Sequence, residues 1–221
     1  MNRENFVVVV GPFPPPYHGQ SKNTNLIAQA LRGPCELVTA NTSGGRAERN
    51  LIYHLTKFRR VINAILTLCR YRSKQSKCLY VSLDSGYGLL YNLATVSIAR
   101  LLGYRIVCHH RSFSYIERHN PLMASVVKAA GVAATHVFLC ESMAQRFMRQ
   151  YACVRPHLVV SNAGHARPPE TELRLPRKSP GRFAVGLLSN LCAEKGLYDF
   201  IDCVRRATQR GLNLEGILAG P

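Results

Sequence analysis

The stretch that decides the fold is Phe6-Val7-Val8-Val9-Val10, followed by Gly11-Pro12-Phe13-Pro14-Pro15-Pro16-Tyr17-His18-Gly19-Gln20-Ser21. An unbroken apolar run rich in valine is typical of a strand that is buried on both faces of a sheet. The prolines and glycines that follow end the strand, and a helical pattern begins near residue 21. A strand, a loop and a helix in this order indicate the opening of an α/β fold.

The same order of short apolar run, loop and helical segment continues along the chain. Strands are predicted at 6–10, 36–39, 78–82, 105–108, 136–139, 158–160, 183–188 and 215–219. Helices are predicted near 21–32, 50–73, 89–102, 121–130, 142–151 and 197–210. This alternation predicts an α/β protein with a Rossmann-like parallel sheet and helices on both faces. Functional loops then follow the C-terminal ends of the strands.

One break in composition divides the chain. Residues 163–182 are rich in proline, arginine and polar residues and lack periodicity, which is typical of a linker. We therefore predict a Rossmann-like domain over 1–162, a linker over 163–182, and the beginning of a second Rossmann-like domain over 183–221.

The charge of the chain is strongly positive. Twenty-nine Lys and Arg against 12 Asp and Glu give a formal net charge of +17. Such an excess indicates a polyanionic partner, which could be a nucleic acid, an anionic membrane surface or a phosphate-bearing small molecule. No zinc-finger, helix-turn-helix or RNA-binding signature accompanies it, so a specific nucleic-acid partner is not expected.

The cysteines and the apolar segments bear on the compartment. The eight cysteines form no CxxC pair and no zinc-binding spacing, which favours a reducing cytoplasm. No signal peptide is recognisable. Residues 122–140 come nearest to a membrane span, but polar residues interrupt them, and a helix followed by a buried strand explains them better.

The loop after the first strand is the first candidate site. A glycine-containing loop that opens a helix presents free backbone N–H groups, and the positive end of the helix dipole, to an anion. The loop matches neither the G-x-G-x-x-G fingerprint nor a P-loop. A stiff connection without a ligand explains the same residues equally well.

Six segments in order carry a resemblance to a known family. They are the loop 11–21, His109-His110, Phe138-Leu139-Cys140-Glu141-Ser142, residues 159–164, Leu188-Ser189-Asn190-Leu191 with Glu194-Lys195-Gly196, and Leu218-Ala219-Gly220-Pro221. In this order and spacing the chain resembles family 4 glycosyltransferases of the GT-B fold. The resemblance implies a retaining transfer from a nucleotide-sugar to a glycan or lipid-linked acceptor in cell-surface polysaccharide synthesis.

The resemblance also implies roles for particular residues. Gly19 falls where the loop backbone approaches the donor diphosphate, and His110 falls at the histidine that hydrogen-bonds the transferred sugar, with the adjacent His109 as an alternative. Lys195 falls at the lysine that neutralises the diphosphate leaving group, which a fixed cation can do without a metal. Without the neighbouring motifs, a solvated helix start would be the default explanation for Lys195.

Two departures from the family stand out. Asn190 lies where many relatives have an arginine that also holds the diphosphate, so the charge is lost there. The family's glutamate pair for the donor does not occur before Pro221, so weak donor binding and little or no turnover are expected of this chain alone. No cofactor is expected. The site is expected to be metal-independent, since the sequence has no Asp-x-Asp triplet. Acceptor-side candidates are Tyr17, His18, His109 and Asp84, although a turn role explains Asp84 at least as well.

A basic segment precedes the third strand. Residues 49–83 contain no acidic residue but eight Lys or Arg, and the 49–77 part is a candidate contact for an anionic membrane surface. Phe58, Val61, Ile62, Ile65, Leu66 and Cys69 share one helical face that is expected to pack inward. The expected location is therefore the cytoplasm, with contact to the inner membrane face as an extension. Two alternatives remain open: a basic α/β module for nucleotides or nucleic acid, and a non-catalytic scaffold that keeps the acceptor-side lobe.

Overall fold

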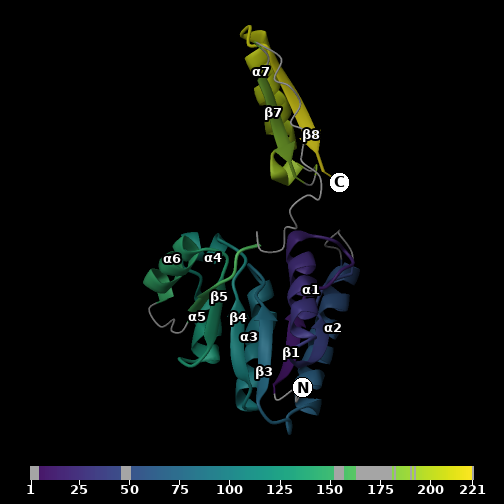
Figure 1. The fold of residues 1–221 in the computed structure, drawn as a ribbon, viewed down its shortest axis with the longest axis vertical. Coiled ribbons are helices and arrows are strands. Elements are labelled where there is room, and N and C mark those ends of the chain that lie inside the picture. Colours follow the sequence, from purple (N-terminus) through teal and green to yellow (C-terminus); the bar gives the residue numbers. More distant parts are fainter. Residues whose placement is uncertain are drawn as a thin grey trace. The chain divides into compact units, whose positions relative to one another are not determined.

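The structure is a computed structural model that describes residues 5–45, 51–151, 157–162, 181, 183–189, 191 and 193–220. The chain divides into two compact units, Met1–Arg167 and Pro168–Pro221, and each is described by itself (Figure 1). The division falls within the predicted linker 163–182, of which only Gly181 is among the described residues.

The first unit alternates strands and helices as the sequence predicts. Its elements are β1 (Phe6–Gly11), α1 (Gly19–Leu31), β2 (Glu36–Asn41), α2 (Leu51–Arg70), β3 (Lys77–Ser82), α3 (Gly88–Leu101), β4 (Arg105–His109), α4 (Ser114–Glu117), α5 (Pro121–Ala130), β5 (Thr135–Phe138), α6 (Glu141–Tyr151) and β6 (His157–Val159). All six strands are parallel, in the order β2-β1-β3-β4-β5-β6. The predicted Rossmann-like α/β fold is confirmed, and only the short helix α4 was not foreseen in this unit.

The strand order changes direction between β1 and β3. The chain passes from β1 to its neighbour β2 and then crosses back to β3 on the other side of β1. At such a switch point the loops after neighbouring strands diverge, and ligands of open α/β sheets bind in the crevice that results. The fold therefore directs attention to the C-terminal ends of β1, β2 and β3.

Alternate residues of β1 enter two different cores. Phe6, Val8 and Val10 belong to the large core with α2, α3, α5 and α6. Val7 and Val9 belong to the smaller core beneath α1. Burial on both faces explains why β1 reads as a continuous valine run instead of an alternating pattern.

The predicted inward face of α2 is wrong in part. The buried residues of α2 are Val61, Ala64 and Leu68, of which Ala64 and Leu68 belong to the large core, whereas Ile62 and Leu66 are exposed. Phe58, which was also assigned to the inner face, is exposed as well. The buried face includes the small Ala64, so it carries less apolar surface than the exposed face with Phe58, Ile62 and Leu66.

The second unit contains one strand–helix–strand repeat. Strands β7 (Phe183–Leu188) and β8 (Leu214–Ala219) pair in parallel, with the 3-10 helix η2 (Ala193–Lys195) and helix α7 (Leu197–Gln209) between them. Gly216 of β8 lets α7 approach closely, since a Cβ there would lie 3.1 Å from Val204 Cγ2. These elements match the strands and the helix predicted from the sequence.

In the described part of the chain, no helix is long and apolar enough to cross a membrane. Residues 122–140, the nearest candidate in the sequence, form most of α5 and then β5. Asn120 caps α5, since its Oδ1 accepts hydrogen bonds from the backbone N–H groups of Leu122 and Met123. The prediction of a helix followed by a buried strand is confirmed.

Candidate functional site

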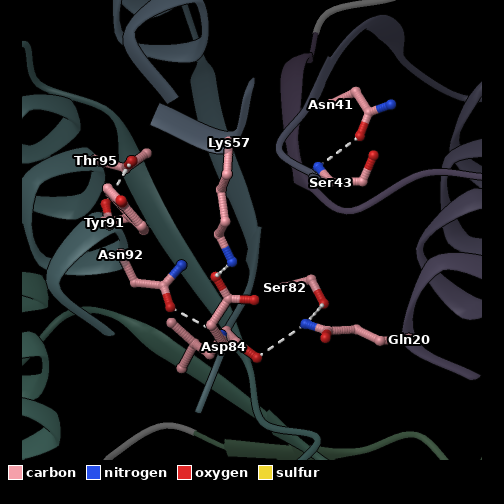
Figure 2. Close-up of polar contacts among 10 residues, drawn as sticks. Gln20, Asn41, Ser43, Lys57, Ser82, Asp84, Tyr91, Asn92 and Thr95 are labelled. Carbon is pink, nitrogen blue, oxygen red and sulfur yellow. Dashed lines mark hydrogen bonds and ion pairs between the residues drawn. The ribbon is translucent and has the colours of Figure 1, made fainter. Parts of the chain in front are cut away.

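The candidate site lies at the C-terminal ends of β1, β2 and β3. These strands end at Gly11, Asn41 and Ser82, and they are neighbours in the sheet. Figure 2 shows polar side chains that converge on the ends of these strands from α1, α2 and α3. Most of them come from segments far apart in the sequence, so the fold assembles the site.

Gly19 is the first residue of α1, and it has open space where a side chain would be. A Cβ built on Gly19 meets no atom within 4 Å. Neither packing nor backbone conformation in this structure therefore requires glycine at this position. A ligand that approaches the backbone closely would require glycine, and this role of Gly19 stays a prediction.

His18 fixes the start of α1 through a capping box. Its Nδ1 accepts a hydrogen bond from the Ser21 backbone N–H at 3.2 Å, and its own backbone N–H donates to Ser21 Oγ at 3.0 Å. Burial lowers the pKa of His18, Asp84 opposes that shift, and Lys57 adds to it. His18 is therefore a neutral cap that lies within electrostatic reach of both charged residues, while the neighbouring Tyr17 is largely exposed.

Gln20 joins the first turn of α1 to the end of β3. Its Nε2 donates to Ser82 Oγ at 3.2 Å and to the Leu83 carbonyl at 3.0 Å (Figure 2). Among the described residues, its Oε1 has no protein partner. That oxygen is available as an acceptor for a ligand hydroxyl.

Asn41, the last residue of β2, joins the loop after β1 to the loop after β2. Its Oδ1 accepts from the backbone N–H groups of Phe13 and Ser43, at 3.1 and 2.9 Å. Arg60 of α2 then donates to the Ser43 carbonyl at 2.9 Å. The described residues supply no acceptor for Asn41 Nδ2, so this amide group is a spare donor at the end of β2.

Lys57 and Asp84 form an ion pair at the centre of the view in Figure 2. Lys57 Nζ lies 2.9 Å from Asp84 Oδ2, and both side chains are about six-sevenths buried, at 13% and 14% exposure. The Asp84 backbone N–H donates to Asn92 Oδ1 at 2.8 Å. Gly88 accommodates the carboxylate, because a Cβ there would lie 2.6 Å from Asp84 Cβ. Asp84 is thus both a fixed turn residue and a paired charge, and its Oδ1 accepts from no described residue.

His109 and His110 do not reach the strand-end surface. His110 is fully buried, its Nε2 lies 2.8 Å from His136 Nδ1, and its ring stacks on Phe138 with centroids 4.6 Å apart. His109, also buried, hydrogen-bonds the Tyr80 hydroxyl through Nδ1. The contact of His110 with a sugar stays a prediction, and this arrangement disfavours it because aromatic side chains surround the ring.

His110 and His136 are neutral at pH 7. Burial, with a smaller effect of the neighbouring His136 and His109, lowers the pKa of His110 well below its usual range. Burial alone lowers the pKa of His136 to about 4. One ring therefore donates and the other accepts in the His110–His136 hydrogen bond.

Arg111 places a cation directly after the two histidines. Its Nη1 donates to Asn162 Oδ1 at 3.3 Å, and Asn23 of α1 donates to the same oxygen at 2.9 Å. Its Nη2 lies 3.4 Å from His109 Nδ1. Sequence reasoning missed Gln20, Asn41, Lys57 and Arg111. For three of them the sequence did contain a signal, namely their position. Asn41 lies just after a predicted strand, Arg111 lies just after another, and Gln20 follows the loop after the first strand.

The remaining predicted donor-side residues belong to the second unit. Lys195 ends the short helix η2 and is exposed, and Gly196 follows it in the left-handed conformation at φ 78°. A glycine is required there because a side chain would be strained. Asn190 lies outside the described residues.

What this arrangement can do chemically is bind a polar ligand. The described residues contain no group of three or more His, Cys, Asp or Glu side chains that could hold a metal ion. They offer spare hydrogen-bonding groups on Gln20, Asn41 and Asp84 beside the N-terminus of α1. A hydroxyl-rich ligand with an anionic part would match this combination of donors, acceptors and helix dipole.

A hollow elsewhere in the first unit lies between α5 and the end of α6. Its volume is about 240 Å³, and its lining includes Val127, Val132 and Tyr151. The lining is mostly apolar, and the Tyr151 hydroxyl already donates to the Tyr115 carbonyl at 2.6 Å. The strand-end site is the better candidate because its polar groups converge at the switch point of the sheet.

Comparison with known proteins leaves the family open. No protein-family model matches the chain, and neither a curated protein nor a solved structure matches it significantly. The class that fold and site define is an α/β protein with a Rossmann-like first unit and a polar site at its switch point.

Proposed function

We propose that the chain is a glycosyltransferase of the GT-B type, retaining and metal-independent, with a nucleotide-sugar donor. Its acceptor is a glycan or a lipid-linked sugar in cell-surface polysaccharide synthesis. The observation that carries the proposal is the polar set at the ends of β1, β2 and β3 beside a glycine with open space, Gly19. The order of the six sequence segments supports it further.

The first unit suits the acceptor. Sugar hydroxyls both donate and accept hydrogen bonds, and the site offers a spare donor on Asn41 and spare acceptors on Gln20 and Asp84. Lys57 balances the charge of Asp84, so the carboxylate can accept from a hydroxyl without an unpaired buried charge. The N-terminus of α1 adds attraction for a phosphate on the acceptor or the donor.

The second unit suits part of the donor. Lys195 follows a strand and precedes α7, and a lysine there can neutralise a departing diphosphate without a metal. Asn190 would supply a hydrogen-bond donor nearby in the chain but no charge.

Gly19 gives the test its variants. Gly19→Ala adds one methyl group in open space, so folding should be unaffected. Gly33→Ala is the matched control, because a Cβ there also meets nothing within 4 Å and Gly33 lies past the other end of α1. Binding of short-chain alkyl-diphosphate monosaccharides, and of uridine- and guanosine-diphosphate sugars, would be followed by saturation-transfer NMR.

We expect Gly19→Ala to weaken binding at least about tenfold at an unchanged Tm, and Gly33→Ala to bind like the wild type. Equal binding by the Gly19 and Gly33 variants would overturn the site. Transfer of radiolabelled sugar to the alkyl-diphosphate acceptor separates a transferase from a non-catalytic scaffold. Salt-dependent binding of random DNA, with no binding of any sugar compound, would favour the basic module instead.

A further inference from the structure

Helix α2 exposes most of its large apolar side chains to solvent. The exposed residues, with their exposed fractions, are Leu51 (73%), Ile52 (52%), Leu55 (60%), Phe58 (53%), Ile62 (40%) and Leu66 (59%). We call this set the outer stripe. Leu51, Leu55, Phe58, Ile62 and Leu66 follow one another at spacings of four, three, four and four, which places them on one side of the helix.

The outer stripe is more apolar than the buried face of the same helix. The buried face consists of Val61, Ala64 and Leu68. An ordinary surface helix has the reverse arrangement, with its large apolar residues inward. At about 1.5 Å per residue, the stripe from Leu51 to Leu66 is about 22 Å long, which is too extended to be a scatter of single exposed residues.

Positive charge flanks the outer stripe. Arg59 lies four residues after Leu55, and Arg70 lies four residues after Leu66, so both are neighbours of the stripe on the exposed surface. The sequence from 49 to 83 contains no Asp or Glu to oppose them. The chain as a whole carries +17.

We propose that the outer stripe is a docking surface for an anionic lipid bilayer. An acidic lipid surface offers both a negatively charged headgroup layer for the arginines and an apolar layer beneath it for leucine, isoleucine and phenylalanine. Nucleic acid matches the charge but offers no apolar layer for six aliphatic and aromatic side chains. The high positive charge of the chain disfavours a second copy of itself as the occupant.

The docking surface and the candidate site share one helix. Lys57 and Arg60 reach from α2 to Asp84 and Ser43, while Phe58 of the same turn is on the exposed side. A bilayer on the outer stripe would therefore lie next to the polar site. This consequence rests on the proposed function: the acceptor would then be a lipid-linked sugar presented at the headgroup layer. The docking itself does not depend on it.

The absence of tryptophan from the sequence provides a clean reporter. Phe58→Trp introduces a single fluorophore into the outer stripe, and Leu101→Trp introduces one at the exposed end of α3 as a matched control. The full chain would be mixed with vesicles of neutral phosphatidylcholine, with and without 30% phosphatidylglycerol. We expect a blue shift, and quenching by brominated acyl chains, for Phe58→Trp with the acidic vesicles and neither for Leu101→Trp.

Two sets of substitutions separate the contributions in vesicle sedimentation. Leu55→Ser with Phe58→Ser removes apolar contact and should weaken binding to acidic vesicles at least about tenfold. Arg59→Gln with Arg70→Gln removes two charges and should weaken it about 30-fold at low salt. Neither set touches the candidate site, so sugar binding should be unchanged.

Three results would overturn the proposal. The first is no vesicle binding at low salt. The second is vesicle binding that the Leu55 and Phe58 substitutions leave unchanged. The third is a dimer that these substitutions dissociate in gel filtration, which would make the outer stripe a protein interface. Failure of the sugar-binding test would leave the vesicle result standing, so the two proposals fail separately.

Discussion

Removal of the buried His110–His136 pair should make the first unit less sensitive to acid. Both rings are at most 2% exposed and share a hydrogen bond of 2.8 Å. The folded-state pKa of His136 is about 4, against about 6.5 for histidine in an unfolded chain. Below pH 6.5 the unfolded state therefore binds more protons than the folded state, and stability falls as the pH drops toward 4.

The size of the effect follows from these two values. Between pH 7.5 and 5, His136 alone should reduce the free energy of unfolding by about 2 kcal/mol. The pKa of His110 is also lowered by burial, so His110 adds to this loss in the same direction. His18 adds a smaller effect of the same sign, since its side chain is only partly buried.

The assay compares two proteins. His110→Phe combined with His136→Leu removes both hydrogen-bonding partners at once and leaves an apolar cluster with Phe138 and Phe147. Urea unfolding followed by circular dichroism at pH 7.5 and 5 gives the loss of stability for each protein. The loss should be at least about 2 kcal/mol smaller in the double variant, because carboxylates and His18 titrate alike in both.

Equal losses in the two proteins would refute the assignment of acid sensitivity to this pair. His136→Asn offers a second route if the double variant does not fold. It keeps an amide partner for His110 and removes only one titrating group. Its loss of stability should lie between those of the wild type and the double variant.

Further substitutions test the packing of α2 and the ion pair. Asp84→Ala leaves Lys57 largely buried without its partner and should destabilise the first unit by somewhat less than the roughly 3–5 kcal/mol typical of fully buried pairs. Adding Lys57→Met should recover part of that loss, and urea unfolding of both variants checks the order. Leu68→Ala should cost about 2–5 kcal/mol because Leu68 is fully buried, whereas Leu66→Ala on the exposed side should change stability by less than about 0.5 kcal/mol. Thermal unfolding of these two variants tests which face of α2 enters the core, and similar Tm values would contradict the arrangement.

The fold could be predicted from the sequence because the first strand, β1, has an unmistakable pattern of consecutive apolar residues. Val7 and Val9 enter one core and Val8 and Val10 the other, so every position of β1 is apolar and the run predicts a strand buried on both faces. The short helix α4 escaped prediction, since four residues cannot display a helical period. The patterns that indicate strands and helices lie within short segments of the sequence, which is why these elements could be predicted.

The candidate site was readable only in part. Gly19, His18 and Asp84 were found, because a glycine before a helix and a carboxylate after a strand are local signals. Asn41 and Gln20 were missed, since an amide becomes a site residue only when the strand order places its loop beside the others. Burial of His110 depends on packing against α6, and the sequence does not contain that information in any local pattern.

Helix α2 shows most clearly what the structure adds to a count of charges. The sequence treats the basic residues of 49–83 alike, but Lys57, Arg60 and Lys74 are occupied by Asp84, Ser43 and Glu36.

Among the other basic residues of this segment, Arg59 and Arg70 are exposed and lie beside the outer stripe, where they are available to an outside surface. Two arginines contribute about 2 kcal/mol, which is too little to hold a protein on a membrane without apolar contact. Raising the salt concentration should therefore weaken vesicle binding of the full chain without abolishing it, because burial of Leu55 and Phe58 is insensitive to screening. Complete release at about 0.5 M salt would mean that the stripe does not enter the bilayer.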